Sequence, residues 1–205
     1  MSLLSIALPF AIVLIALTIH EAAHAWTAER LGDPTARILG RVSLNPIVHI
    51  DPIGTILLPL LAAYSGLPII GWAKPVPVDV RRLRRGRQDF MLVAAAGPIS
   101  NLLQAVAAAA AYRVVTAGAG GQGLLPSLLA AVVIINLLLA FFNLIPVPPL
   151  DGGNVLAGLL PESAEPLFAV LRQYGFIVLY ALMLTGVLNA IITPPTRFFE
   201  RILLP

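Results

Sequence analysis

Long apolar runs, separated by short stretches that are polar or rich in glycine and proline, set the pattern of this chain. About 20 apolar residues are enough to cross a bilayer as a helix. The pattern therefore predicts transmembrane helices at about 3–28, 90–116, 124–145 and 166–192. The connecting stretches leave no room for a sizeable soluble domain. We therefore predict one integral-membrane domain over residues 1–205, of the all-α polytopic class.

A further apolar stretch, 52–70, is interrupted by glycines and prolines, so it is either a second full span or a re-entrant segment. Irregular backbone at membrane depth must be sheltered by protein, which favours the re-entrant alternative. Prolines at 75 and 77 exclude a helix and a central strand from the next stretch, 71–79. This stretch is predicted to be an extended segment at the interface, a short membrane-associated β segment. Alternation around 36–44 predicts a second short strand.

The composition supports a membrane protein, because 59% of the 205 residues are hydrophobic and only 11% are charged. A soluble domain would be about a quarter charged. The absence of cysteine excludes disulfides and thiolate metal sites, so a metal would need nitrogen and oxygen ligands. The net charge of +3 comes largely from five arginines within 81–87. In a membrane protein such a cluster places its loop in the cytoplasm, and it does not indicate nucleic acid. The N-terminal run has no basic leader or cleavage site and is predicted to be retained.

The candidate chemistry begins near the end of the first run, in the sequence His20-Glu21-Ala22-Ala23-His24. Residues four apart lie on one face of a helix, so two imidazoles could bind one zinc ion. Glu21 would then be close enough to act on a metal-bound water. The alternative for these residues is a polar contact between helices. Polar groups inside an apolar helix are costly unless they have a partner or a function.

Asp151 is the candidate third ligand, and it follows the proline-rich break after the run at 124–145. The alternative is a helix cap or a turn residue. If 52–70 is re-entrant, the ends of the first run and of the run at 124–145 lie on the same membrane face. If 52–70 crosses fully, they lie on opposite faces. A site that joins His20, His24 and Asp151 therefore requires the re-entrant path and opens toward the cytoplasm.

Three motifs occur in an order that resembles the site-2 protease family of intramembrane zinc metalloproteases, in a compact form without PDZ or CBS domains. They are His20-Glu21-x-x-His24, Ala96-Gly97-Pro98-Ile99-Ser100-Asn101 and Phe142-Asn143-Leu144-Ile145-Pro146-Val147-Pro148-Pro149-Leu150-Asp151-Gly152-Gly153. The resemblance implies one zinc ion per chain, bound by His20, His24 and Asp151. It implies that Glu21 is the catalytic base and that Asn143 holds the substrate or the oxyanion.

Segment 71–79 is similar to the strand that guides substrate in this family. The resemblance implies substrate contacts there, and the candidate residues are Trp72, Lys74, Val76 and Val78. The other polar residues in apolar surroundings have simpler interpretations. Asn101 and Asn136 are predicted to form hydrogen bonds between helices, and His49 to be a loop residue.

The function that this resemblance implies is hydrolysis of a peptide bond in or near a transmembrane segment of a membrane-protein substrate. The expected location is a bacterial or archaeal cell membrane, with the lipid bilayer as solvent and no nucleic-acid partner; the oligomeric state stays open. The alternative is a membrane transporter or metal-handling protein, but no repeated halves are visible in the sequence. A catalytically silent scaffold is a third class. Glu21 argues against it, because a scaffold needs the metal ligands but not the base.

Overall fold

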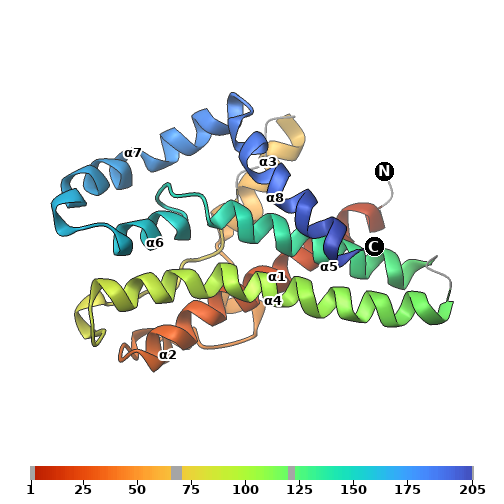
Figure 1. Cartoon of the computed structure of the whole chain (residues 1–205), viewed down its shortest axis with the longest axis horizontal. Helices are drawn as coiled ribbons and strands as arrows, with labels where there is room; N and C mark the ends of the chain where they lie inside the picture. The colour runs from red at the N-terminus through yellow and green to blue at the C-terminus, as the bar shows by residue number, and fades with distance from the viewer. Residues whose placement is uncertain (1–2, 66–70, 120–122, 205) are drawn as a thin grey trace.

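The computed structural model describes residues 3–65, 71–119 and 123–204, and every regular element within these ranges is helical (Figure 1). The α-helices are α1 (Leu3–Arg30), α2 (Thr35–Ile38), α3 (Leu58–Ser65), α4 (Arg87–Ala119), α5 (Leu124–Asn143), α6 (Asp151–Leu159), α7 (Glu165–Leu184) and α8 (Val187–Leu203). Shorter helical turns are Pro46–His49, Pro52–Leu57, Val80–Arg82 and Glu162–Ala164.

Among the described residues, four helices are long and apolar enough to cross a membrane, as the sequence predicts. They cover Ala7–Arg30, Arg87–Gly118, Leu124–Asn143 and Glu165–Leu184. The last of these is shorter than the predicted span at 166–192. Its helix ends at Leu184 because Gly186 adopts a positive φ of 76° and turns the chain into α8.

Helices α1, α4 and α5 form the core of the molecule, and α4 packs against both of the others and against α6 (Figure 1). Small side chains on α4 line its contact with α5, where Ala105, Ala108 and Ala109 pack against Val133 and Leu137. Small residues let membrane helices approach closely, so dispersion contacts accumulate along the whole interface. Helix α4 is thereby held against α5, and α1 and α6 pack against it.

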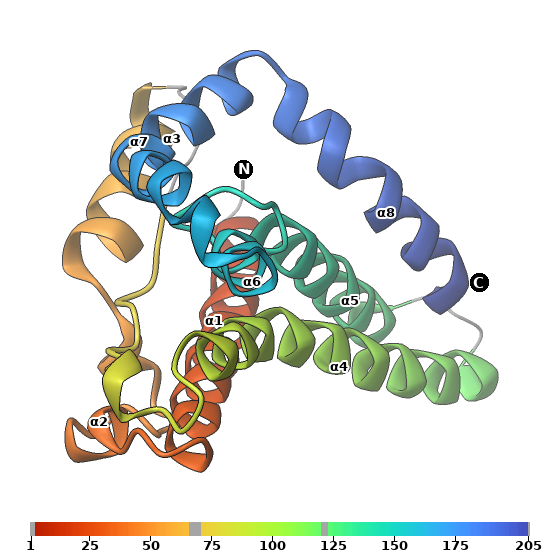
Figure 2. The same cartoon turned by 60° about the vertical axis from the view of Figure 1, so that its left-hand side comes forward.

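Helices α7 and α8 form an arch beside this core (Figure 2). Helix α8 returns along α5, where the rings of Phe141 and Phe199 lie 5.5 Å apart between centroids. Helix α7 approaches the loop before α6 through Gly175. A Cβ at this glycine would overlap the carbonyl of Pro148, so the close approach requires glycine.

The two predicted strands are wrong, since no strand occurs among the described residues. In segment 71–79 the backbone donors bond to three separate acceptors instead of a neighbouring strand. Trp72 N donates to Gly54 O at 3.2 Å, Lys74 N to His49 O at 2.8 Å and Val76 N to Glu21 Oε2 at 3.2 Å. A strand needs a partner with regularly spaced groups, and here the acceptors come from two short helical turns and from a side chain of α1.

The predicted strand at 36–44 is instead the short helix α2 followed by a turn. Asp33 explains this difference, because its Oδ1 accepts hydrogen bonds from the backbone N and the hydroxyl of Thr35. This side-chain contact starts a helical turn at a place where the alternating pattern alone suggests extension.

The apolar segment 52–70 begins with a π-helical turn, Pro52–Leu57, which continues into α3. Asp51 caps its start by accepting hydrogen bonds from the backbone of Ile53 and Gly54. Residues 66–70 lie outside the described residues. The helical part is shorter than the four candidate spans, and the re-entrant path stays a prediction.

Candidate metal centre

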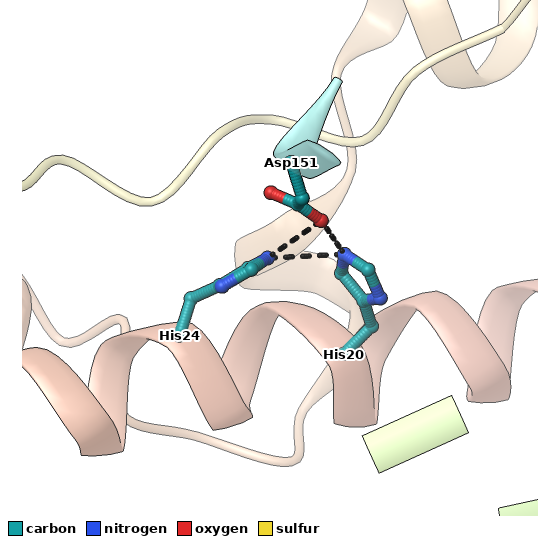
Figure 3. Close-up of side chains that lie close together, drawn as sticks. All are labelled: His20, His24 and Asp151. Atoms are coloured by element: carbon teal, nitrogen blue, oxygen red, sulfur yellow. Dashed lines mark hydrogen bonds and ion pairs between the residues drawn. The ribbon is translucent and has the colours of Figure 1, made fainter. Parts of the chain in front are cut away.

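Three predicted ligands, distant in sequence, meet at one point in the core (Figure 3). The Nε2 atoms of His20 and His24 lie 3.0 Å apart. Asp151 Oδ2 lies 3.1 Å from His20 Nε2 and 3.4 Å from His24 Nε2. Both histidines are buried and the aspartate is half-buried. Within the described ranges this is the one group of three or more His, Asp or Glu side chains that could hold a metal ion.

Asp151 reaches the histidines because the chain folds tightly between α5 and α6. The next residue, Gly152, lies against the backbone of Leu144 and Ile145, and Gly153 lies against that of Val147 and Pro148. A Cβ at either glycine would overlap these backbone atoms. The two glycines therefore let the first turn of α6 pack on the preceding loop, which directs Asp151 toward α1.

Helix α4 supplies the other side of the centre through Val93, Gly97 and Asn101, which are four residues apart and share one face. His24 Nδ1 lies 2.7 Å from Val93 O, and His20 Nδ1 lies 2.6 Å from Asn101 Oδ1. Between them, a Cβ at Gly97 would overlap both imidazoles. The glycine of the Ala-Gly-Pro motif thus leaves the space that the two histidines occupy.

The electrostatics of the cluster favour a bound cation. His24 Nδ1 faces a carbonyl oxygen and must donate to it, so in the neutral ring Nε2 carries a lone pair. This lone pair converges with Asp151 Oδ2, a buried oxygen without a hydrogen-bond donor among the described residues. Facing acceptors in a buried site repel one another unless a cation lies between them.

The charge state of Asp151 suits metal binding as well. Burial alone would raise the pKa of this carboxyl, but electrostatic attraction to the two imidazoles outweighs burial and lowers the pKa to about 2. The carboxylate is therefore ionised at neutral pH, which is the form that binds metals. Two imidazole nitrogens and one carboxylate oxygen are a donor set that suits zinc.

Glu21, the predicted base, is buried on α1 beside this cluster and contacts segment 71–79. Its Oε2 accepts the hydrogen bond from Val76 N. Arg41 lies close by, with Nη2 donating to the carbonyl of Lys74. Burial lowers the pKa of the Arg41 guanidinium, and the charge of Glu21 opposes that shift. Arg41 thus holds segment 71–79 in place and is electrostatically coupled to Glu21.

No hydrogen bond, ion pair or ring contact among the described residues joins the remaining predicted site residues to the three ligands. Asn143 ends α5 and its Nδ2 donates to Leu139 O of its own helix at 3.0 Å. Trp72 packs against the ring of Phe176 on α7, with 5.9 Å between centroids. Lys74 is exposed, while Val78 packs beside Ala28, Leu83 and Val93. Their roles in substrate binding stay predictions.

Two residues of the site were not recognised as such from the sequence. Arg41 stands in a turn-rich stretch with other charged residues, and nothing in the local pattern distinguishes it. Gly97 stands in one of the three motifs, and a glycine in the middle of a helix is typical of close packing, but its contact with the two histidines was not predicted. His49, by contrast, ends the helical turn Pro46–His49 rather than lying in a loop; it is buried with Nε2 2.8 Å from Ser43 O and lies outside the metal cluster.

Comparison with known proteins identifies the family. A family model described as peptidase family M50 matches residues 118–186. The "putative zinc metalloprotease YwhC" of Bacillus subtilis is 36% identical over 195 residues, which are 91% of this chain and 85% of that protein. The chain belongs to peptidase family M50. The resemblance to site-2 proteases is thereby confirmed.

Other similar proteins agree with this assignment to family M50. The "putative zinc metalloprotease Rip2" is 30% identical in Mycolicibacterium smegmatis and 31% identical in Mycobacterium tuberculosis strain H37Rv. Each match covers 177 residues, 86% of this chain and 66% of the relative. No solved structure matches the chain. This M50 member is accordingly a metalloprotease with zinc as its cofactor, and its four apolar helices make it an integral membrane protein.

Proposed function

We propose that this protein is an intramembrane zinc metalloendopeptidase that hydrolyses a peptide bond in or near a transmembrane segment of a membrane-protein substrate. His20, His24 and Asp151 would hold one zinc ion per chain. The observation that carries the proposal is the meeting of their three ligand atoms, all within 4.8 Å of one another, inside a bundle of membrane-spanning length. Three protein ligands leave one position open, which is typical of catalytic zinc sites.

Glu21 is proposed as the general base. When bound, zinc lowers the pKa of a coordinated water to about 7 and polarises the scissile carbonyl. Glu21 would take a proton from the attacking water and deliver it to the leaving amine. Its burial strengthens such proton transfer by excluding bulk water, and the hydrogen bond from Val76 N holds one carboxylate oxygen in place. Asn143, after turning from Leu139 O, would donate to the developing oxyanion.

Segment 71–79 is proposed to hold the substrate next to Glu21. A helical substrate must unwind locally, because its amides are shielded by their own hydrogen bonds. Both backbone groups of Trp72 and of Lys74 bond to the protein, so this edge of the segment is anchored. In an extended chain the backbone groups of the intervening residues, Ala73, Pro75 and Pro77, point to the other edge. The two prolines have no N–H, so this edge would offer the unwound substrate mainly carbonyl acceptors. The side chains of Trp72, Lys74, Val76 and Val78 would contact its residues.

The proposed orientation opens the active site toward the cytoplasm of a bacterial or archaeal cell. This orientation is supported by the position of the arginine-rich loop at the end of α1, where Arg84 N donates to Leu31 O at 3.1 Å. A re-entrant path for 52–70 is supported by two hydrogen bonds between Trp72, which follows this segment, and residues at the beginning of the segment. Trp72 N donates to Gly54 O, and Thr55 Oγ1 donates to Trp72 O. The relatives named above are bacterial proteins.

A liposome experiment separates this function from the alternative of a metal transporter. The purified protein is reconstituted with a membrane-spanning helical peptide, and both peptide cleavage and zinc flux into the lumen are measured. The proposal expects cleavage that stops when a chelator removes zinc and returns when zinc is restored. Zinc flux without cleavage of any membrane-spanning peptide would favour the transporter.

A further inference from the structure

Three buried polar side chains form a row across the core, one from each central helix. They are His20 of α1, Asn101 of α4 and Asn136 of α5. Asn101 and Asn136 are 0% and 1% exposed, so each unsatisfied amide atom would be costly. Every amide atom has a partner: His20 Nδ1 lies 2.6 Å from Asn101 Oδ1, Asn101 Nδ2 lies 2.8 Å from Asn136 Oδ1, and Asn136 Nδ2 lies 3.0 Å from Val132 O.

The direction of every hydrogen bond in this row follows from its last member. Val132 O is a backbone carbonyl and can only accept, so Asn136 must present its NH₂ group to it. Asn136 Oδ1 then faces Asn101 and can only accept from Asn101 Nδ2. Asn101 Oδ1 is therefore turned toward His20, and His20 Nδ1 must be the donor. In the neutral ring, His20 Nε2 consequently carries the lone pair, directed at Asp151 and His24.

We propose that Asn101, supported by Asn136, is a positioning residue that fixes the ring orientation and the tautomer of His20 for metal binding. This inference rests on the proposed metal site, because it concerns how one of its ligands is prepared. A partner that accepts from the second ring nitrogen of a histidine ligand typically changes metal affinity by about 10–100-fold.

The two histidines differ in a way that makes the inference testable. His24 obtains the same tautomer from the backbone carbonyl of Val93, which side-chain substitution leaves in place. His20 obtains it from a side chain. A substitution at Asn101 should therefore disturb only the His20 half of the centre, while a general loosening of the α1–α4 contact would disturb both halves.

The experiment measures the zinc dissociation constant of the full-length protein in detergent by competition with a chromophoric chelator. Asn101→Leu, similar in volume but unable to accept, should weaken zinc binding by about 10–100-fold. Asn101→Asp keeps an acceptor for His20 Nδ1 and should lose less affinity than Asn101→Leu, although its second carboxylate oxygen would face Asn136 Oδ1 without a donor. Ser100→Ala is the matched control, since its hydroxyl bonds only to Gly97 O of its own helix, at 2.7 Å, and affinity should not change.

A double-substitution cycle separates positioning from packing. If Asn101 acts through His20, Asn101→Leu should cause no further loss in a His20→Ala background but should still weaken binding in a His24→Ala background. An equal further loss in both backgrounds would overturn the inference, because it would mean that Asn101 acts on the bundle as a whole. Unchanged affinity in Asn101→Leu alone would overturn it as well.

Failure of this inference can be told apart from failure of the proposed function. If wild type binds zinc and loses it on His20→Ala, the metal site stands, and only the Asn101 variants decide the inference. If His20→Ala and His24→Ala both leave zinc affinity unchanged, the site itself is wrong. If Asn101→Leu does not fold, the same double-substitution cycle is measured with Asn136→Leu. This variant should lose less zinc affinity than expected for Asn101→Leu, and the loss should again depend on His20. Unchanged zinc affinity would overturn the inference.

Discussion

Asp151 shows at the scale of single residues how the centre depends on charge. Its carboxylate is the one anionic ligand between two imidazoles, and its Oδ2 has no hydrogen-bond donor among the described residues. Replacing it with asparagine preserves the shape of the side chain but removes the charge that a divalent cation requires. The residue therefore contributes to the centre through its charge more than through the space it fills.

Asp151→Asn is expected to weaken zinc binding by more than about 100-fold. This exceeds the loss of affinity that is typical when a residue hydrogen-bonded to a metal ligand is replaced. Zinc content after dialysis against a weak chelator, measured by atomic emission, checks this. Asp79→Asn is the control, because hydrogen bonding to Arg81 lowers the pKa of the Asp79 carboxyl, and this ion pair lies outside the metal cluster. A full zinc complement in Asp151→Asn would exclude this aspartate as a ligand.

Single residues also show what the sequence could and could not predict about the site. His20 and His24 were recognisable because helical periodicity alone places them on one face. Asp151 was recognisable from its proline- and glycine-rich context. The tautomer of His20, the proximity of Arg41 to Glu21 and the space left by Gly97 depend on contacts between distant segments, which no local pattern contains.

Helix α4 is the element that holds the centre together, since its residues at spacing four face both histidines. Gly97→Ala should push the imidazoles apart and weaken zinc binding by about 10–100-fold, the range for disturbed ligand orientation. Gly118→Ala on the same helix is the matched control, because a Cβ there meets nothing within 4 Å. Equal zinc dissociation constants for the two variants would contradict this view of the helix.

Segment 71–79 is the second element on which the account depends, and Arg41 anchors it through Lys74 O. Arg41→Gln should lower the cleavage rate about tenfold while zinc content stays intact, because displacement of a substrate-positioning group by about 1 Å can cost up to about 100-fold. Arg37→Gln is the control, since Arg37 is exposed and pairs with Glu29. Loss of zinc, or equal cleavage by both variants, would argue against this role.

The same segment shows why some elements were predicted wrongly. Its prolines correctly excluded a helix, but whether an extended stretch becomes a strand depends on a partner, and here the partners are His49 O, Gly54 O and the side chain of Glu21. The last span ends earlier than predicted for a local reason, because Gly186 adopts a left-handed backbone conformation. Long apolar helices were the most predictable elements, because length and composition decide them.

At the scale of the whole molecule, the account requires that 52–70 leave the membrane on the face where it enters. The chain has no cysteine, so single cysteines can be introduced without background. Leu44→Cys and Arg81→Cys, both at exposed positions, should react with an impermeant maleimide from the same face. Leu124→Cys, at the start of α5 and also exposed, should react from the opposite face. Labelling of Leu44→Cys and Arg81→Cys from opposite faces would mean that the segment crosses.

The path of the chain explains why ligands so distant in sequence can meet. Helix α4 starts beside the end of α1, α5 returns along α4, and the loop after α5 brings Asp151 back to α1. The order of the apolar runs predicts this meeting only if 52–70 is re-entrant, and the resemblance to site-2 proteases implied the three ligands. The close packing that makes it geometrically exact, through Gly152 and Gly153, became visible only in three dimensions.

The most direct test of the central claim compares Glu21→Gln with wild type, measuring zinc content and cleavage of a membrane-spanning peptide in liposomes. Glu29→Gln serves as control, since Glu29 lies on the same helix but pairs with Arg37 outside the metal cluster. The account predicts that Glu21→Gln keeps its zinc and loses at least about 100-fold in cleavage rate, the contribution expected of a general base. Cleavage by Glu21→Gln at the rate of wild type, with zinc bound in both, would contradict it.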